Sequence, residues 1–310
     1  MDSAPLFAAR EARVAIDGAV AIDALTLESK GDRLLFAGDV GALLSVLTGV
    51  PRAATTGARA LDDGDAPPLG EALVVSGSLL LAGKNVGAGE HVATTGSAPL
   101  DPPLPAGWSA LEYVSWSARL AGITRSAAAR LALTALDRVG LGASAKKAAT
   151  ALALPERRAL QLASAIVASP EVIIAEAPLG GLDGPAAAFV LRAVASATDG
   201  RRAVLSAARL EPGTPEGALC LGASHVVVLA GGEVALEGTP AKLFGAARLY
   251  ALTVHSNADR FREELGAAGI ALRGGPRRFS VALPEGASTR QILVAAKAAR
   301  AAVVELVPIL

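Results

Sequence analysis

The feature that most constrains the fold is a regular alternation of helical and strand-like segments between residues 156 and 207. ERRALQLASAIVAS and GPAAAFVLRAVASATDG carry apolar residues at helical spacing, and a short apolar run, EVIIAEA or RAVLSA, follows each of them. Short apolar runs between helices indicate strands that are buried on both faces. Strands joined through helices form parallel βαβ units. The sequence therefore predicts an α/β domain built on a parallel sheet.

The remaining segments predict three additions to this core. Alternating blocks before residue 33 and around LVVSGSLLLAGKNV favour an antiparallel β subdomain, and residues 108–154 favour a helical subdomain. From about Leu249 the pattern becomes βαββαβ, which indicates a small C-terminal α+β domain. We therefore predict a large α/β domain over residues 1–245 and an accessory domain over residues 249–310.

Composition restricts the class of protein. Hydrophobic residues make up 52% of the 310, yet no run approaches the roughly 18 apolar residues that span a bilayer. The N-terminal residues do not form a basic-then-apolar secretory signal. The single cysteine, Cys220, indicates a reducing compartment, and 29 basic against 29 acidic residues give no reason to expect a nucleic-acid partner. The prediction is a cytoplasmic protein.

Taken together, the ordered motifs resemble the ATP-binding cassette (ABC) ATPases. The most specific stretch is LALPERRALQLASAIVASPEVIIAEAPLGGLD (152–183), which fits the family's signature helix, strand and D-loop without a gap. RLLFAG, PPLPAGWSALEYV and HVVVLAGGEVALEGTPAKLF match earlier and later family segments in order. Within that family, the chain most resembles the cytosolic subunits of bacterial ABC-2-type exporters. It implies a P-loop NTPase fold with ATP and Mg²⁺ as ligands.

The expected phosphate loop is degenerate. Phosphate binding needs a loop of free backbone N–H groups, a Lys for the β- and γ-phosphates and a Ser or Thr hydroxyl for Mg²⁺. Here the junction between strand and helix contains Gly38, Asp39 and Gly41, about three residues short of the family loop, with no Lys and no hydroxyl at the helix start. Asp39 also places a negative charge at the phosphate position. We expect an ordinary tight turn, although a weak anion site at the helix start remains an alternative.

One of two expected carboxylates is missing after the strand EVIIA. In the gapless register Glu176 replaces the aspartate that organises Mg²⁺, and Ala177 replaces the general base. An alternative register makes Glu176 the base and Ala175 the lost metal ligand, at the cost of an inserted residue. The simpler interpretation of Glu176 is a carboxylate at a strand end that pairs with nearby backbone or an arginine.

The signature loop and the remaining motifs are also altered. The resemblance implies a serine and two glycines that grip phosphate across a dimer, but the loop reads Leu152, Ala153, Leu154, Pro155 and Glu156. The switch histidine is replaced by Ala208, and the expected glutamine and adenine-stacking aromatic are missing from their segments. Asp183 matches the D-loop aspartate, and we interpret it as a helix N-cap.

These losses predict that no cofactor binds tightly and that hydrolysis is absent. Because both halves of a composite ATP site are altered, pairing with an active copy would damage both sites. The first hypothesis is a structural or regulatory subunit that docks on an ABC-2-type membrane permease at the inner face of the membrane. Trp108, Tyr113 and Trp116 are candidate docking residues, with core packing as the alternative for each. A second ATPase subunit or a homodimer is a further partner.

Two other hypotheses remain open. The chain could be a working ATPase with divergent loops that energises an ABC-2-type exporter, or a cytosolic scaffold that is independent of any transporter. Saturable Mg-ATP binding with turnover would favour the working ATPase over a subunit without ATPase activity. Association with a permease would favour the docking subunit over the independent scaffold.

Overall fold

The computed structural model describes residues 4–16, 19–49, 52–53, 69–70, 72–86, 95–244, 248–275, 277–284 and 287–308. Within these ranges, no helix is both long and apolar enough to cross a membrane. The segment 51–72 is rich in Gly, Pro and Asp and predicts a polar loop, but most of it lies outside the described residues, as does His91.

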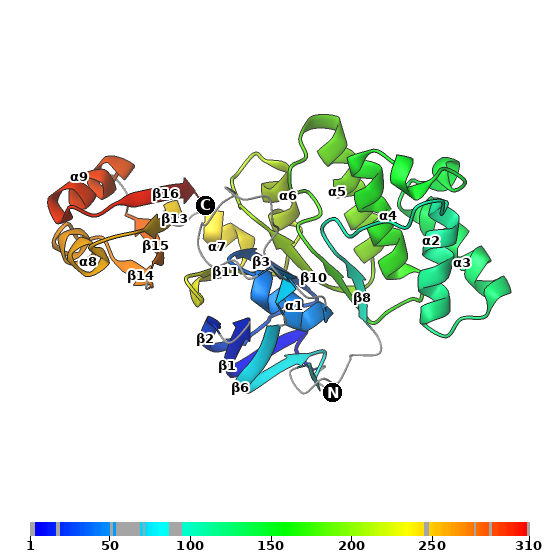
Figure 1. Ribbon diagram of the computed structural model, residues 1–310, viewed down its shortest axis with the longest axis horizontal. Coiled ribbons are helices and arrows are strands. Elements are labelled where there is room, and N and C mark those ends of the chain that lie inside the picture. The colour runs from blue at the N-terminus through cyan, green and yellow to red at the C-terminus, as the bar shows by residue number, and fades with distance from the viewer. Residues whose placement is uncertain are drawn as a thin grey trace.

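A six-stranded sheet with the order β12-β11-β3-β10-β9-β8 lies at the centre of the molecule (Figure 1). Its strands are β3 (Arg33–Gly38), β8 (Thr95–Ala98), β9 (Val172–Ala175), β10 (Arg202–Ala207), β11 (His225–Ala230) and β12 (Glu233–Gly238). All but β12 run parallel, and β12 turns back on β11 through Gly231 and Gly232, whose φ angles of 61° and 85° favour glycine. The predicted α/β class and parallel core are confirmed.

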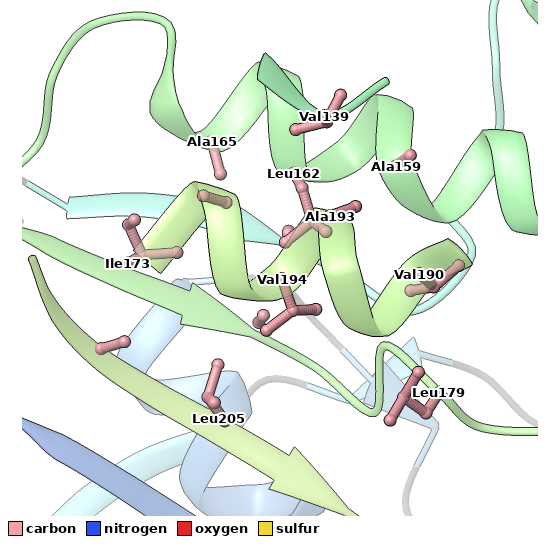
Figure 2. Close-up of a cluster of buried hydrophobic side chains, with 14 of the residues drawn as sticks. Val139, Ala159, Leu162, Ala165, Ile173, Leu179, Val190, Ala193, Val194 and Leu205 are labelled. Atoms are coloured by element: carbon pink, nitrogen blue, oxygen red, sulfur yellow. The ribbon is translucent and has the colours of Figure 1, made fainter. Parts of the chain in front are cut away.

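Strand β3 is buried on both faces and separates two hydrophobic cores. Leu35 and Ala37 belong to the core under the helices, whereas Leu34 and Phe36 belong to the core on the opposite face. Figure 2 shows part of the first core, in which Leu162 and Ala193 lie close together between two helices and Val194 faces the sheet. The helices on this side are α4 (Leu154–Ile166), α5 (Gly184–Thr198), α6 (Pro215–Leu221) and α7 (Pro240–Phe244).

The second core lies between the central sheet, α1 (Gly41–Thr48) and an antiparallel sheet of order β2-β1-β6-β7. Phe7 and Phe36 meet here edge to face with ring centroids 5.3 Å apart. The strands are β1 (Phe7–Ile16), β2 (Ala19–Glu28), β6 (Ala72–Leu81) and β7 (Lys84–Asn85), and a separate short pair joins β4 (Arg52–Ala53) to β5 (Leu69–Gly70).

The helical region follows β8. It contains α2 (Ala110–Leu120), α3 (Arg125–Arg138), η1 (Gly142–Ser144) and η2 (Ala149–Ala151). Ser109 starts α2 with a capping box: its hydroxyl accepts from the N–H of Glu112, and the Glu112 carboxylate accepts from the N–H of Ser109 at 2.8 Å. These helices lie within the predicted helical subdomain.

The C-terminal residues form a unit with its own core at the other end of the molecule from α2 and α3 (Figure 1). Its elements are β13 (Arg248–Val254), α8 (Ala258–Ala267), β14 (Leu272–Gly274), β15 (Arg278–Leu283), α9 (Thr289–Ala299) and β16 (Val303–Pro308), and the sheet order is β14-β15-β13-β16. The βαββαβ order agrees with the predicted fold class. We propose residues 249–310 as a domain distinct from residues 1–245.

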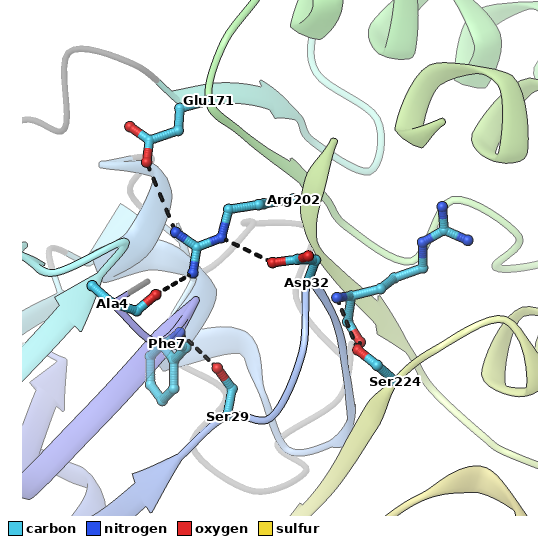
Figure 3. A network of polar contacts seen from close by, with 8 residues as sticks. Ala4, Phe7, Ser29, Asp32, Glu171, Arg202 and Ser224 are labelled. Carbon is cyan, nitrogen blue, oxygen red and sulfur yellow. Dashed lines mark hydrogen bonds and ion pairs between the residues drawn. The ribbon is translucent and has the colours of Figure 1, made fainter. Parts of the chain in front are cut away.

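A polar network closes the edge of the central sheet at which β3 and β10 begin (Figure 3). The guanidinium of Arg202 lies 3.4 Å from the carboxylate of Asp32 and 3.8 Å from that of Glu171, and it donates to the carbonyl of Ala4 at 2.7 Å. The hydroxyl of Ser29 accepts from the N–H of Phe7 at 2.8 Å. The candidate nucleotide-site residues stand at or just after the ends of β3, β9 and β10, so they lie at the opposite edge: Gly38, Asp39, Glu176, Ala177 and Ala208.

The packing of α4 on β8 can be tested at Gly96. A Cβ added there would collide with the backbone carbonyl of Ala165 in α4, which cannot move aside as a side chain could. We expect Gly96→Ala to lower the free energy of unfolding by about 1–3 kcal/mol in urea denaturation.

The matched control is Gly266→Ala, which makes the same substitution at an exposed position in α8 with open space around it. This change should raise the free energy of unfolding by about 0.5–1 kcal/mol, because alanine is the better helix former. Equal effects of the two variants would contradict the close packing of α4 on β8.

Candidate functional site

The turn between β3 and α1 consists of Asp39 and Val40, and both of its N–H groups are engaged. The N–H of Asp39 donates to the carbonyl of Leu229 at 2.9 Å, and the N–H of Val40 donates to the carbonyl of Gly38 at 2.9 Å. Gly38 has a φ of 83°, and an added Cβ would collide with the Leu229 carbonyl, so only glycine fits this contact. The turn is tight, as predicted, and neither of its own N–H groups is turned outward to a ligand.

The carboxylate of Asp39 is held from two sides. One oxygen lies 2.7 Å from the guanidinium of Arg278 on β15, and the other accepts from the N–H of Gly231 at the long distance of 3.4 Å. The helix start at Gly41 is half-buried and has open space where a side chain would be. The negative charge predicted at the phosphate position is therefore present, and it forms an ion pair within the protein.

Glu176 and Ala177 follow the end of β9. The carboxylate of Glu176 is half-buried and accepts from the N–H of Leu100 at 3.1 Å, in agreement with the interpretation of a carboxylate that pairs with nearby backbone. Ala177 has a φ of 34°, and its N–H donates to the hydroxyl of Ser206 at 2.9 Å. The backbone around the lost carboxylate is therefore held by the neighbouring strand.

A pocket of about 280 Å³ lies between the β3 turn and the C-terminal sheet. Gly38, Asp39 and Ala208 line it from the core, and Arg278 and Glu305 are among the residues that line it from the C-terminal unit. The structure thus brings together the residues at the phosphate and switch positions. Within the described residues, no three His, Cys, Asp or Glu side chains converge as they would around a metal ion.

The start of α4 carries its own cap. The Glu156 carboxylate accepts from the N–H of Ala153 at 2.8 Å, from Lys147 Nζ at 3.1 Å and from the Ser144 hydroxyl at 3.1 Å. The bond from Ala153 is the main cause that lowers the pKa of Glu156 below its usual value near 4.5, and Lys147 and Ser144 add to it against the effect of burial. A backbone donor at this helix start is therefore already bound to an internal anion.

The other signature positions keep the geometry of a helix start without polar groups. Leu152 is buried, whereas Leu154 and Pro155 are half-buried in the first turn of α4. Asp183 occupies the N-cap position of α5 with extended backbone, and its side chain makes no capping hydrogen bond. Asp183 is therefore at the N-cap position of α5, as interpreted from the sequence, but its side chain does not cap the helix.

The candidate docking aromatics divide into two kinds. Trp108 and Trp116 meet edge to face with centroids 5.7 Å apart, Arg119 lies 4.9 Å from the Trp116 ring, and Trp116 is 42% exposed. Tyr113 instead faces α4: its hydroxyl donates to the Gln161 side chain at 3.0 Å, and burial raises its pKa. The tryptophan pair is at the surface, and the tyrosine is part of the internal packing.

Sequence reasoning missed Arg278 and Ser206. Ser206 is a single hydroxyl at the end of an otherwise apolar strand, which is a weak signal for a polar contact at that edge. Arg278 lies beside a second arginine in the segment RGGPRRF, and the neighbouring residues do not indicate which of the two would reach the β3 turn.

Comparisons with known proteins give partial relatives in sequence and a match to a known fold. No family model matches the chain. ATP-binding cassette sub-family A member 7 of Mus musculus is 33% identical over 146 residues, which are 46% of this chain and 7% of that protein. The lipoprotein-releasing system ATP-binding protein LolD of Nitratidesulfovibrio vulgaris is 37% identical over 76 residues, which are 24% of this chain and 33% of LolD. The chain thus spans only part of the length of these relatives.

The fold itself is matched over most of the chain. The solved structure of cbiO1 from Clostridium perfringens, part of the ABC transporter complex cbiONQ, gives a TM-score of 0.60 at 17% identity, over 79% of this chain and 92% of cbiO1. The chain therefore has the ABC ATPase fold, and the resemblance inferred from its motifs is confirmed at that level.

The cap at α4 can be tested through its pH dependence. Because the pKa of Glu156 is lowered in the folded state, its charge contributes stability above about pH 4.5, and this contribution is lost as the pH falls through the folded pKa. We expect Glu156→Gln to cost less than about 1 kcal/mol at pH 7, and the difference from the unsubstituted protein to be smaller at pH 3.

Urea denaturation at the two pH values measures this difference. Glu263→Gln, which alters an exposed acid inside α8, is the control. A cost that stays the same at both pH values would mean that Glu156 contributes through packing and not through its charge.

Proposed function

We propose that the chain is an ABC-fold subunit of a membrane transport complex that has lost ATP binding and hydrolysis and acts as a structural or regulatory element. The observation that carries this proposal is the Asp39–Val40 turn, whose N–H groups are both used internally and whose carboxylate forms an ion pair with Arg278. A phosphate at this turn would have to displace these bonds and approach a negative charge.

The Mg²⁺ ligands are incomplete as well. Mg²⁺ in nucleotide sites is held by a carboxylate, a hydroxyl at the helix start and the phosphates. Here the helix start reads Gly41-Ala42, and the carboxylate of Glu176 already binds the N–H of Leu100. The residues present do not fit Mg-ATP.

The magnitude of the loss supports the absence of turnover. Removing one transition-state contact costs about 10²–10³ in rate. The lysine, the general base and the signature donors are all missing from this chain, and Glu156 caps the helix start at which γ-phosphate would be gripped. The two composite sites of a dimer would both be affected, which favours a role beside a separate ATPase subunit or as a homodimer without ATP-driven closure.

The helical region supports a docking role. Trp108 and Trp116 form a partly exposed aromatic pair, and Leu120, one turn further along α2, is 72% exposed. Exposed aromatic anchors beside an arginine are typical of protein interfaces. We propose that this patch receives an ABC-2-type membrane permease, which would place the chain at the cytoplasmic face of the membrane.

The loss of nucleotide binding is tested by titrating the protein with Mg-ATP in a calorimeter up to about 5 mM, together with a phosphate-release assay. We expect a Kd weaker than about 1 mM and no phosphate release above the buffer rate. Saturable micromolar binding with turnover would contradict the proposal and support a working ATPase.

The docking role is tested by co-expression with an ABC-2-type permease from the same genome. Trp116→Ala should weaken co-purification by about tenfold or more, because a buried tryptophan anchor is worth upwards of 1 kcal/mol. Leu221→Ala, which alters a 65% exposed residue at the end of α6, is the control and should have no effect. Failure of the unsubstituted chain to bind the permease would favour an independent scaffold.

A further inference from the structure

We infer that the C-terminal domain is latched onto the β3 turn, and that the latch is the ion pair between Asp39 and Arg278. The two side chains lie 239 residues apart in sequence, and their charged atoms are 2.7 Å apart. Their exposed fractions are 38% and 37%, so the pair is neither fully solvated nor fully buried. The latch rests on the proposed function at one point only, namely that the turn between β3 and α1 corresponds to a phosphate-binding loop.

Asp39 joins three parts of the molecule. Its N–H binds Leu229 of β11, one carboxylate oxygen accepts from Gly231 of the β11–β12 hairpin, and the other binds Arg278 of β15. An acid at this position is unfavourable for phosphate binding, but it suits the bond to an arginine. The Asp39 carboxylate is therefore explained by the contact with the C-terminal domain.

Backbone contacts accompany the ion pair. A Cβ added to Gly231 would lie 2.7 Å from the carbonyl oxygen of Arg278 and 3.1 Å from Cα of Gly274. Because both neighbours are backbone of the C-terminal domain, the hairpin and β15 approach as closely as glycine allows. The Arg273 guanidinium also reaches the carbonyl of Ala235 at 3.5 Å, near the limit for a hydrogen bond.

The C-terminal sheet also limits the space beside the turn. The pocket that it shares with the turn measures about 280 Å³, which is near the lower end of the roughly 300–1,000 Å³ of small-molecule sites. Thr253 and Glu305 belong to its C-terminal wall and are hydrogen-bonded to each other at 3.0 Å. The latch therefore keeps a wall of the C-terminal domain beside the β3 turn.

The hairpin offers a matched pair of variants to test the latch. Gly231 and Gly232 both have positive φ angles, so alanine is strained at either position. Gly231→Ala pushes against the C-terminal domain, whereas the Cβ of Gly232→Ala would lie 2.8 Å from the Ala21 carbonyl in β2. Only Gly231→Ala should separate the domains.

A second pair of variants avoids backbone strain. Arg278→Ala removes the ion pair, and Arg277→Ala removes the neighbouring exposed arginine and serves as the control. Hydrogen exchange is followed in peptides that cover residues 229–233 and 277–281, and small-angle X-ray scattering gives the radius of gyration. We expect Gly231→Ala and Arg278→Ala to speed exchange about tenfold in these peptides and to increase the radius, while the controls do neither.

Unchanged exchange and radius in both Gly231→Ala and Arg278→Ala would overturn the latch. Titration of Arg278→Ala with Mg-ATP separates this inference from the proposed function. Binding by this variant, but not by the unsubstituted chain, would support the latch and contradict the claim that lost donors alone prevent binding. Absence of binding in both proteins, together with faster exchange in the variant, would agree with both proposals.

Discussion

The arrangement of the whole molecule depends on β3, a strand that must be buried on both faces. Leu35 and Ala37 pack under the helices, and Leu34 and Phe36 pack against α1 and the antiparallel sheet, so each layer is stabilised only when β3 lies between them. The residue after β3 is therefore the point at which both layers and the neighbouring strands meet. Whatever side chain stands there can contact several parts of the chain at once, and in this protein it is Asp39.

Two acids stand where the ABC resemblance implies phosphate, and the carboxylates of both bind groups within the chain. Glu156 caps α4 through the N–H of Ala153, and Asp39 precedes α1 and binds Arg278. A carboxylate near a helix N-terminus is favourable by about 0.3–1 kcal/mol through the same partial positive charge that would attract a phosphate. At α4 the acid and the ligand would compete for one electrostatic feature, so the internal cap by Glu156 works against phosphate binding at that helix start.

Local patterns in the sequence predicted the elements, because their causes are local. Buried apolar strands, the Gly231–Gly232 hairpin, the tight turn after β3 and the βαββαβ order all follow from residues close together in the chain. The pairing of Asp39 with Arg278 could not be predicted in this way, since it depends on how two domains approach across 239 residues. The bond from Ala177 to Ser206 similarly depends on which strands become neighbours in the sheet.

The two ends of the molecule differ in how their polar and apolar groups are used. At the carboxyl edge of the sheet, Asp39, Glu176 and the N–H of Ala177 all bind groups within the chain, and the C-terminal domain stands beside them. At the helical end, Trp116 and Leu120 keep large apolar areas in contact with water. Burial of such area is favourable at about 25 cal/mol per Å², whereas opening the carboxyl edge would first break hydrogen bonds and an ion pair. We therefore propose that a partner binds more readily at the helical end than at the carboxyl edge, where the polar groups already bind one another.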